Sequence, residues 1–131
     1  MRFLLDNWLA ARHARALNEI VKPDHTFEHF QQKFFANTKD EDWVGALSGE
    51  NNLVVISGNH RVSKSVHERR AWQESGLTIF FLSKDWMNIP PLQQHSKLAL
   101  LVDGIIAHAE RTRPGSGFTI SPKGKIQRIY P

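Results

Sequence analysis

The chain has no cysteine among its 131 residues, which excludes disulfide bridges and zinc bound by thiolates. No apolar run approaches the roughly 18–20 residues of a membrane span. The richest segment, residues 98–109, is shorter and carries Asp103. Asp6 interrupts the first apolar run, so no secretory signal peptide is expected. We therefore expect a soluble, cytoplasmic protein with no membrane partner.

The excess of charge of one sign is also small. There are 17 Lys and Arg against 13 Asp and Glu, a formal net charge of +4. Such an excess points to nucleic acid only if acids gather in a pocket and bases line its rim. The chain is 40% hydrophobic and 10% aromatic, enough to build a core. We expect one domain over residues 1–131.

Apolar periodicity predicts strands that alternate with helices. Two capping boxes, Thr38 with Glu41 and Ser65 with Glu68, are expected to begin helices. The last helix is expected to begin at Pro90-Pro91, with an apolar stripe at positions 92, 95, 98, 102, 105 and 109. Strands are expected within residues 1–7 and at 25–27, 53–57, 77–82, 118–120 and 125–129, and helices at about 8–21, 39–48 and 65–75.

This alternation predicts an α/β fold: a sandwich with a mainly parallel central sheet and a C-terminal β-hairpin. In open parallel sheets, ligands lie beyond the carboxyl ends of the strands. Polar residues at those ends are therefore the candidates for a functional site.

Asp6 ends the first strand. It has two interpretations of about equal weight, as an N-cap of the following helix or as a metal ligand. Helical geometry places Asp40 near the inner face defined by Trp43, Val44 and Leu47, whereas Asp42 points away. An inward carboxylate needs a positive partner. Asp40 is therefore the acid favoured for a site, with Glu41 sufficiently explained by its capping box.

Asn59 follows the strand at 53–57, where it is either a residue of a polar turn or an amide-oxygen ligand for a hard cation, weaker than a carboxylate. Ser57 is a candidate to orient a water, and His60 and Arg61 are candidates to contact phosphate. Four further bases either form a phosphate rim or are simply solvated: Lys64, Arg69, Arg70 and Lys84.

Other polar or aromatic residues are better explained without a functional role. His25 and His29 are four residues apart but lack a third zinc ligand. His13 lies on an apolar stripe and is expected to be a core histidine. We expect Trp43 and Trp72 in the core, and Asp103 in solvent.

In order and spacing, several segments together resemble the PIN-like domains of VapC-type toxins from bacterial toxin–antitoxin systems. The resemblance covers nearly the whole chain, including the 113–115 turn and the final hairpin. The segments that carry it are Phe3-Leu4-Leu5-Asp6-Asn7, Thr38-x-Asp40-x-Asp42-Trp43, Val54-Val55-Ile56-Ser57-Gly58-Asn59-x-Arg61 and Glu68-x-x-Ala71-x-x-Glu74.

The resemblance implies a PIN-like three-layer α/β/α sandwich and an endoribonuclease that depends on Mg²⁺ or Mn²⁺. Asp6 and Asp40 match the first two acids of the family, which hold the metal that activates water. The implied partners are RNA and an inhibitory antitoxin, and a homodimer is a further candidate. The residues expected to support the metal ligands or to contact phosphate are Ser57, His60, Arg61, Asp42 and Arg69.

At position 59 the chain departs from the family pattern, which has Asp where this chain has Asn. The loss of one negative charge should weaken metal binding and water activation. Either the protein is a weakened or inactive member, or Asn59 is an engineered change that silences a toxic nuclease. The rival hypothesis is a non-catalytic PIN-like module that binds RNA or protein. We expect Asp6, Asp40 and Asn59 to converge on one pocket.

Overall fold

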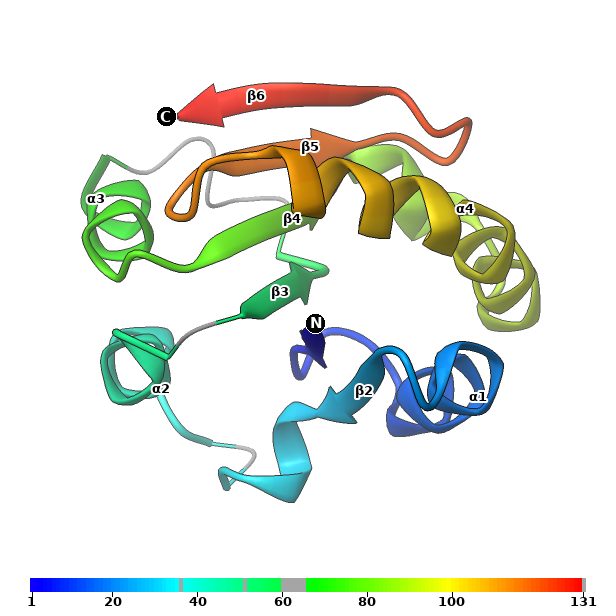
Figure 1. The fold of residues 1–131 in the computed structure, drawn as a ribbon, viewed down its shortest axis with the longest axis horizontal. Coiled ribbons are helices and arrows are strands. Elements are labelled where there is room, and N and C mark those ends of the chain that lie inside the picture. Colours follow the sequence, from blue (N-terminus) through cyan, green and yellow to red (C-terminus); the bar gives the residue numbers. More distant parts are fainter. Residues whose placement is uncertain (36, 51, 60–65, 131) are drawn as a thin grey trace.

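The computed structural model describes residues 1–35, 37–50, 52–59 and 66–130, without the side chains of Asp40, Glu41 and Glu68. It has three layers, with a central sheet between two pairs of helices (Figure 1). α1 and α4 cover one face of the sheet, and α2 and α3 cover the other. The predicted three-layer α/β fold is confirmed.

The sheet has six strands in the order β2-β1-β3-β4-β5-β6, and only the β5–β6 pair is antiparallel. β1 lies between β2 and β3, so the chain moves outward in one direction after β1 and in the other direction after β3. The strands are β1 (Arg2–Leu5), β2 (Thr26–His29), β3 (Leu53–Ser57), β4 (Thr78–Leu82), β5 (Gly117–Ile120) and β6 (Ile126–Tyr130).

The α-helices agree with the predicted positions but differ at their ends. The first begins three residues later than expected, and its N-cap residue, Ala10, makes no side-chain cap hydrogen bond. The N-cap of the second is Lys39, not Thr38, again without a side-chain cap bond. They are α1 (Ala11–Val21), α2 (Asp40–Leu47), α3 (Val66–Glu74) and α4 (Pro91–Arg111), with short 3₁₀ helices η1 (Phe30–Gln32) and η3 (Lys84–Asn88).

Two hydrophobic cores fill the space on either side of the sheet. The core under α1 and α4 is built mostly from aliphatic and phenylalanine side chains, together with Trp86. The core under α2 and α3 centres on Trp43 and Trp72, whose rings meet edge to face at 5.0 Å. Both tryptophans are thus core residues, as predicted. Leu92, a residue of the stripe predicted for the last helix, instead lies largely in solvent, as does Ile20 on α1.

The crossover through α4 has the opposite hand to the other crossovers. β3 to β4 and β4 to β5 both move one strand in the same direction, yet α3 and α4 lie on opposite faces. Parallel crossovers are right-handed in about 98% of cases. Local sequence patterns do not predict this exception, which brings α4 beside α1.

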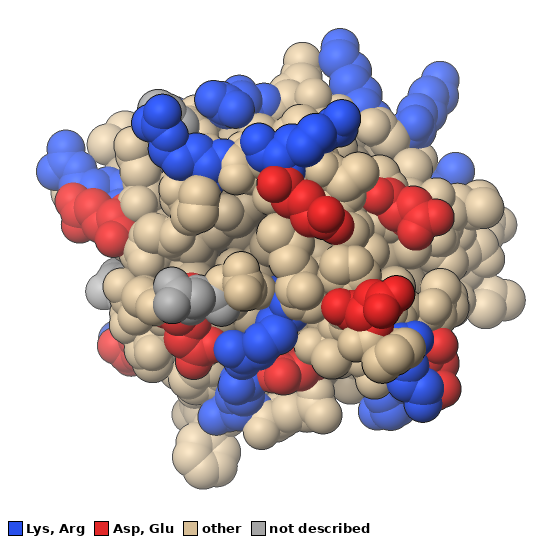
Figure 2. All heavy atoms as spheres, viewed as in Figure 1, with Lys and Arg blue, Asp and Glu red and all other residues tan. Residues whose placement is uncertain are grey.

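The antiparallel strand β6 forms one edge of the sheet. On the face shown in Figure 2, Lys and Arg gather along the rim above β5 and β6, while acids cross the middle. Exposed Lys125 and Arg128 belong to this edge, and such charges discourage pairing with another strand.

Among the described residues, no helix is long and apolar enough to span a membrane.

Candidate metal and nucleic-acid site

Asp6 lies directly after β1, at the point where the order of the strands reverses. Its backbone N–H donates to Ile56 O of the neighbouring strand β3 at 3.1 Å. β1 and β3 therefore end side by side, and Asp6 sits level with the end of β3. In open parallel sheets such a switch point is where ligands bind.

The loop after β3 wraps around the Asp6 carboxylate. The Ser57 hydroxyl donates to Oδ2. Gly58 N–H and Trp8 N–H both donate to Oδ1 at 3.1 Å. Asp6 is only 3% exposed and Ser57 is fully buried. These donors hold the carboxylate in one orientation and stabilise its charged form.

The capping interpretation of Asp6 is wrong. α1 begins at Ala11, too far along the chain for Asp6 to be its N-cap. Asp6 instead accepts a bond from the backbone two residues later, as in an Asx turn. The dipole of α1 therefore does not account for this buried acid.

His29 helps to hold the loop that carries Asp6. Its Nε2 bonds Leu9 O at 2.6 Å, and its Nδ1 accepts from Gln31 N–H. Both ring nitrogens are thus used by the backbone, which fixes the orientation of the ring.

Asn59 is buried at the same strand end, and its backbone N–H donates to Ser57 Oγ at 3.0 Å. Ser57 thereby links the Asn59 backbone to Asp6 Oδ2. The predicted proximity of the Asp6 and Asn59 positions is present in the structure. Their action on a shared ion stays a prediction.

The remaining predicted site residues are placed less completely. Asp40 is the first residue of α2, but its side chain lies outside the described part, as do His60, Arg61 and Lys64 altogether. Asp42 is exposed, away from the buried Trp43 and Val44, as helical geometry predicts.

Arg69 is half-buried on α3, where its charge acts on the phenol of Tyr130. Tyr130 lies at the end of β6. Burial raises the Tyr130 pKa, and the Arg69 charge opposes that rise. The proposed contact between Arg69 and phosphate stays a prediction.

The side-chain oxygens at the carboxyl ends of β1 and β3 are of the chemical type that binds a divalent metal. Asp6 offers a carboxylate and Asn59 an amide oxygen, both hard ligands of the type that Mg²⁺ and Mn²⁺ accept. Among the described residues, however, no cluster of three or more His, Cys, Asp or Glu side chains could hold an ion. A third strong ligand would have to come from Asp40.

Two cavities on the α1/α4 side of Asp6 involve residues that the sequence did not single out for function. One, of about 190 Å³, includes Trp8, Gly58, Ser83 and Met87 in its walls. Trp8 and Met87 are 50% and 59% exposed, respectively. A Trp two residues after the acid is visible in the sequence, but only the fold shows it beside a cavity.

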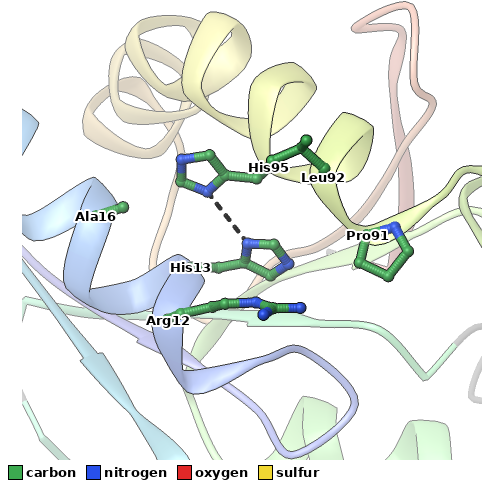
Figure 3. Close-up of a pocket in the computed structure, with 6 residues that line it drawn as sticks. All are labelled: Arg12, His13, Ala16, Pro91, Leu92 and His95. Atoms are coloured by element: carbon green, nitrogen blue, oxygen red, sulfur yellow. Dashed lines mark hydrogen bonds between the residues drawn. The ribbon is translucent and has the colours of Figure 1, made fainter.

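The other cavity, of about 290 Å³, lies between α1 and α4 and is lined in part by Arg12, His13 and His95. Figure 3 shows the two imidazoles facing one another, with Arg12 beside His13. Their Nδ1 atoms are 3.1 Å apart, so one ring donates and the other accepts. Burial, and then the charge of His95, lower the pKa of His13.

Comparisons with known proteins support the same interpretation of the fold. A family model described as "PIN like domain" matches residues 1–84, which include Asp6, Asp40 and Asn59. No match was found among curated proteins, and none among solved structures. Domains of this family are generally metal-dependent nucleases. Because the match covers more than half of the chain, the protein belongs to the family of PIN-like domains.

Proposed function

We propose that the protein is a metal-dependent endoribonuclease, the toxin of a VapC-type toxin–antitoxin pair, attenuated by Asn59. The observation that carries the proposal is the buried Asp6 carboxylate at the β1/β3 switch point, held by Ser57 and Gly58. Family membership supports nuclease chemistry, and the resemblance described above supports the toxin role. An antitoxin would act by covering this site.

Asp6, Asn59 and Asp40 are the residues that would hold the ion. A bound Mg²⁺ or Mn²⁺ supplies charge neutralisation at the scissile phosphate and lowers the pKa of a water. Ser57 fixes the carboxylate through its bond to Oδ2. The Trp8 and Gly58 N–H groups fix Oδ1, so the acid is pre-oriented before substrate arrives.

Asn59 limits this chemistry. With Asp40 and Asp6, an amide at this position gives two negative charges around the ion, whereas an Asp would give three. An amide also cannot accept a proton usefully, so it orients a water without activating it. This residue favours a second candidate function, a catalytically inactive PIN-like module that binds RNA or protein.

The test restores the missing charge. Asn59→Asp should increase Mg²⁺-dependent RNA cleavage and tighten Mg²⁺ binding, measured with labelled RNA and by calorimetric titration. It should also lower the metal-free melting temperature slightly, because a further acid crowds the site. Asp6→Ala in the same background should abolish the gain.

The outcomes separate the two candidates. Equal cleavage by both forms, unaffected by Asp6→Ala, would show that the acid cluster is not an active site. RNA binding without cleavage or metal uptake in Asn59→Asp would favour the inactive module. Co-purification of a small inhibitory protein that blocks cleavage by Asn59→Asp would test the antitoxin.

A further inference from the structure

The cavity of about 190 Å³ shares a wall with the Asp6 site. Gly58 and Trp8 line it, and the backbone N–H groups of both donate to Asp6 Oδ1. The two residues are packed tightly, since a Cβ on Gly58 would lie 2.7 Å from the Trp8 Cβ. The position of Trp8 is therefore coupled directly to the acid.

The opposite wall is formed by η3 and the first turn of α4. Gln94 braces it by donating both N–H bonds of its amide, to Trp86 O at 3.0 Å and to Ile89 O at 2.9 Å. Trp86 is buried and donates its indole N–H to Ile120 O. The cavity thus lies between firmly held elements, which favours a preformed binding site.

The chemistry of the lining suits an uncharged planar ring. Trp8 and Met87 are half exposed at the cavity, where an indole stacks on nucleobases and a thioether packs against aromatic rings. Ser83 lines the cavity, and its hydroxyl is buried with no hydrogen-bond partner among the described residues. Such a group gains most from a ligand that supplies a partner.

The charge of the lining argues against phosphate as the occupant. Among the described residues, the walls carry no Lys, Arg, Asp or Glu. The neighbouring cavity between α1 and α4 differs, because Arg12 and the His13–His95 pair line it (Figure 3). Residues from the start of α4 line both cavities, Gln94 in one and His95 in the other. The lining of the first suits a base, and that of the second suits a phosphate.

We propose that the cavity lined by Trp8, Gly58, Ser83 and Met87, the Trp8 pocket, binds one unpaired nucleobase of an RNA strand whose backbone crosses the Asp6 site. The inference rests on the proposed function, because it takes RNA as the ligand of that site. Trp8 is the stacking platform, Met87 contacts the base from the rim, and Ser83 is the polar group that discriminates among bases.

The experiment measures binding of a short labelled single-stranded RNA in EDTA, where metal-dependent cleavage is blocked. Trp8→Ala should weaken binding by about tenfold or more, since stacking on an aromatic side chain is worth that much per base. Trp8→Phe should retain most of the affinity. Met87→Ala, a change at an exposed side chain, should give a smaller loss without disturbing the fold.

Two controls isolate the base. Leu100→Ala alters another exposed apolar residue of α4, 83% exposed and outside the pocket lining, and should bind as the native chain does. An abasic version of the RNA carries the same phosphates and should bind native protein about as weakly as intact RNA binds Trp8→Ala. Arg12→Ala should reduce the salt dependence of binding, whereas Trp8→Ala should leave it unchanged.

Equal affinity of native protein and Trp8→Ala, or of intact and abasic RNA, would overturn the Trp8 pocket. Its failure is distinguishable from that of the proposed nuclease. If Asn59→Asp cleaves RNA but Trp8→Ala binds normally, only the pocket is wrong. If the binding losses appear but Asn59→Asp does not cleave, the pocket stands and the nuclease proposal fails.

Discussion

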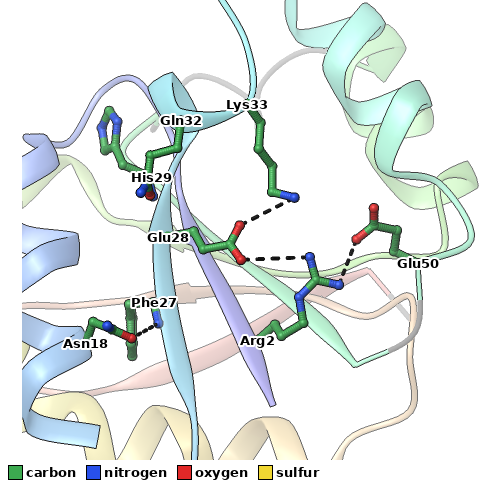
Figure 4. Close-up of polar contacts among 8 residues, drawn as sticks. All are labelled: Arg2, Asn18, Phe27, Glu28, His29, Gln32, Lys33 and Glu50. Carbon is green, nitrogen blue, oxygen red and sulfur yellow. Dashed lines mark hydrogen bonds and ion pairs between the residues drawn. The ribbon is translucent and has the colours of Figure 1, made fainter. Parts of the chain in front are cut away.

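Carboxylates at the two ends of β1 differ in burial and in the groups that bind them. At its start, Arg2 pairs with Glu50 at 3.0 Å and with Glu28 at 4.0 Å, and Glu28 also pairs with Lys33 at 3.5 Å (Figure 4). These four residues, the Arg2 network, remain about one-third exposed. At the other end, Asp6 is buried and its described donors are a hydroxyl and backbone N–H groups.

The contrast shows which acids are available for function. Acids in the Arg2 network are neutralised by flexible neighbours in solvent, an arrangement worth little energy and open to exchange. Asp6 is fixed by rigid groups, the condition for a preoriented ligand. Burial and the kind of partner, more than the number of acids, separate a site from a surface ion pair.

Cavity volume points to the opposite end of the sheet from Asp6. A cavity of about 500 Å³ lies among the loops that enter the strands, lined in part by Met1, Glu50 and Thr112. The cavity beside Asp6 is less than half that size. In an open parallel sheet, however, the helix starts and strand ends that converge on a ligand lie at the carboxyl edge.

The largest expected effect tests the acids themselves. In the Asn59→Asp background, Asp6→Asn should lower Mg²⁺-dependent RNA cleavage by about 100-fold or more, because it removes a charge from the metal site. Glu50→Gln, the matched change in the Arg2 network, should leave the rate within about twofold, since that pair is exposed. Initial rates at saturating Mg²⁺ measure both. If both variants lost the same cleavage rate, Asp6 would be no more important for cleavage than Glu50 at the other end of β1.

Tight packing at the Asp6 end gives the next largest effect. Gly58→Ala places a methyl group 2.7 Å from the Trp8 Cβ. It should lower the free energy of unfolding by about 1–3 kcal/mol, the usual range for overpacking. Gly104→Ala on α4 meets nothing within 4 Å and should raise stability by about 0.5–1 kcal/mol. Urea unfolding compares the two variants. If Gly58→Ala leaves the free energy of unfolding unchanged, Trp8 must be able to move away from the added methyl group.

Protonation of the buried His13 should have a moderate effect on stability. The pKa of His13 is lowered by burial, then by the charges of His95, Arg12 and His29. The unfolded chain therefore binds a proton at a higher pH than the native protein does. The stabilisation is complete above about pH 6.5, the unfolded pKa, and is lost as pH falls through the lower native pKa.

Unfolding free energies measured between about pH 7.5 and 5 should show this decline. His13→Phe should flatten it, although His108, whose pKa is also lowered by burial and by Arg111 and Arg128, leaves part of the slope. His67→Gln changes an exposed histidine of α3 and should leave the profile intact. A steeper profile in His13→Phe would contradict the assigned sign.

The Arg2 network should give the smallest effect. Arg2→Ala removes two exposed ion pairs, and exposed pairs contribute about 0–1 kcal/mol. The resulting loss in the free energy of unfolding should be smaller still in high salt, where surface charges are screened. Chemical denaturation at low and high salt measures it. A loss as large as that of Gly58→Ala would show that this end of the sheet is equally rigid.

Most of the local structure follows from the sequence. Runs of apolar residues at 53–57 and 77–82, bounded by polar or glycine residues, predicted β3 and β4 to within a residue. Helical spacing placed Trp43 and Trp72 in the core and Asp42 in solvent. These features depend on the period of side chains along a segment and on nearby turn residues, both of which a linear sequence contains.

The tertiary structure decided the features that depend on pairing between distant segments. In the sequence alone, the capping and metal interpretations of Asp6 have equal weight. Only the fold excludes the cap, because α1 begins at Ala11 and Ser57 and Gly58 bond the carboxylate. The opposite hand of the α4 crossover brought His95 to His13 and left Leu92 in solvent, against the predicted stripe. Register and handedness come from contacts across dozens of residues, which helical or strand periodicity does not contain.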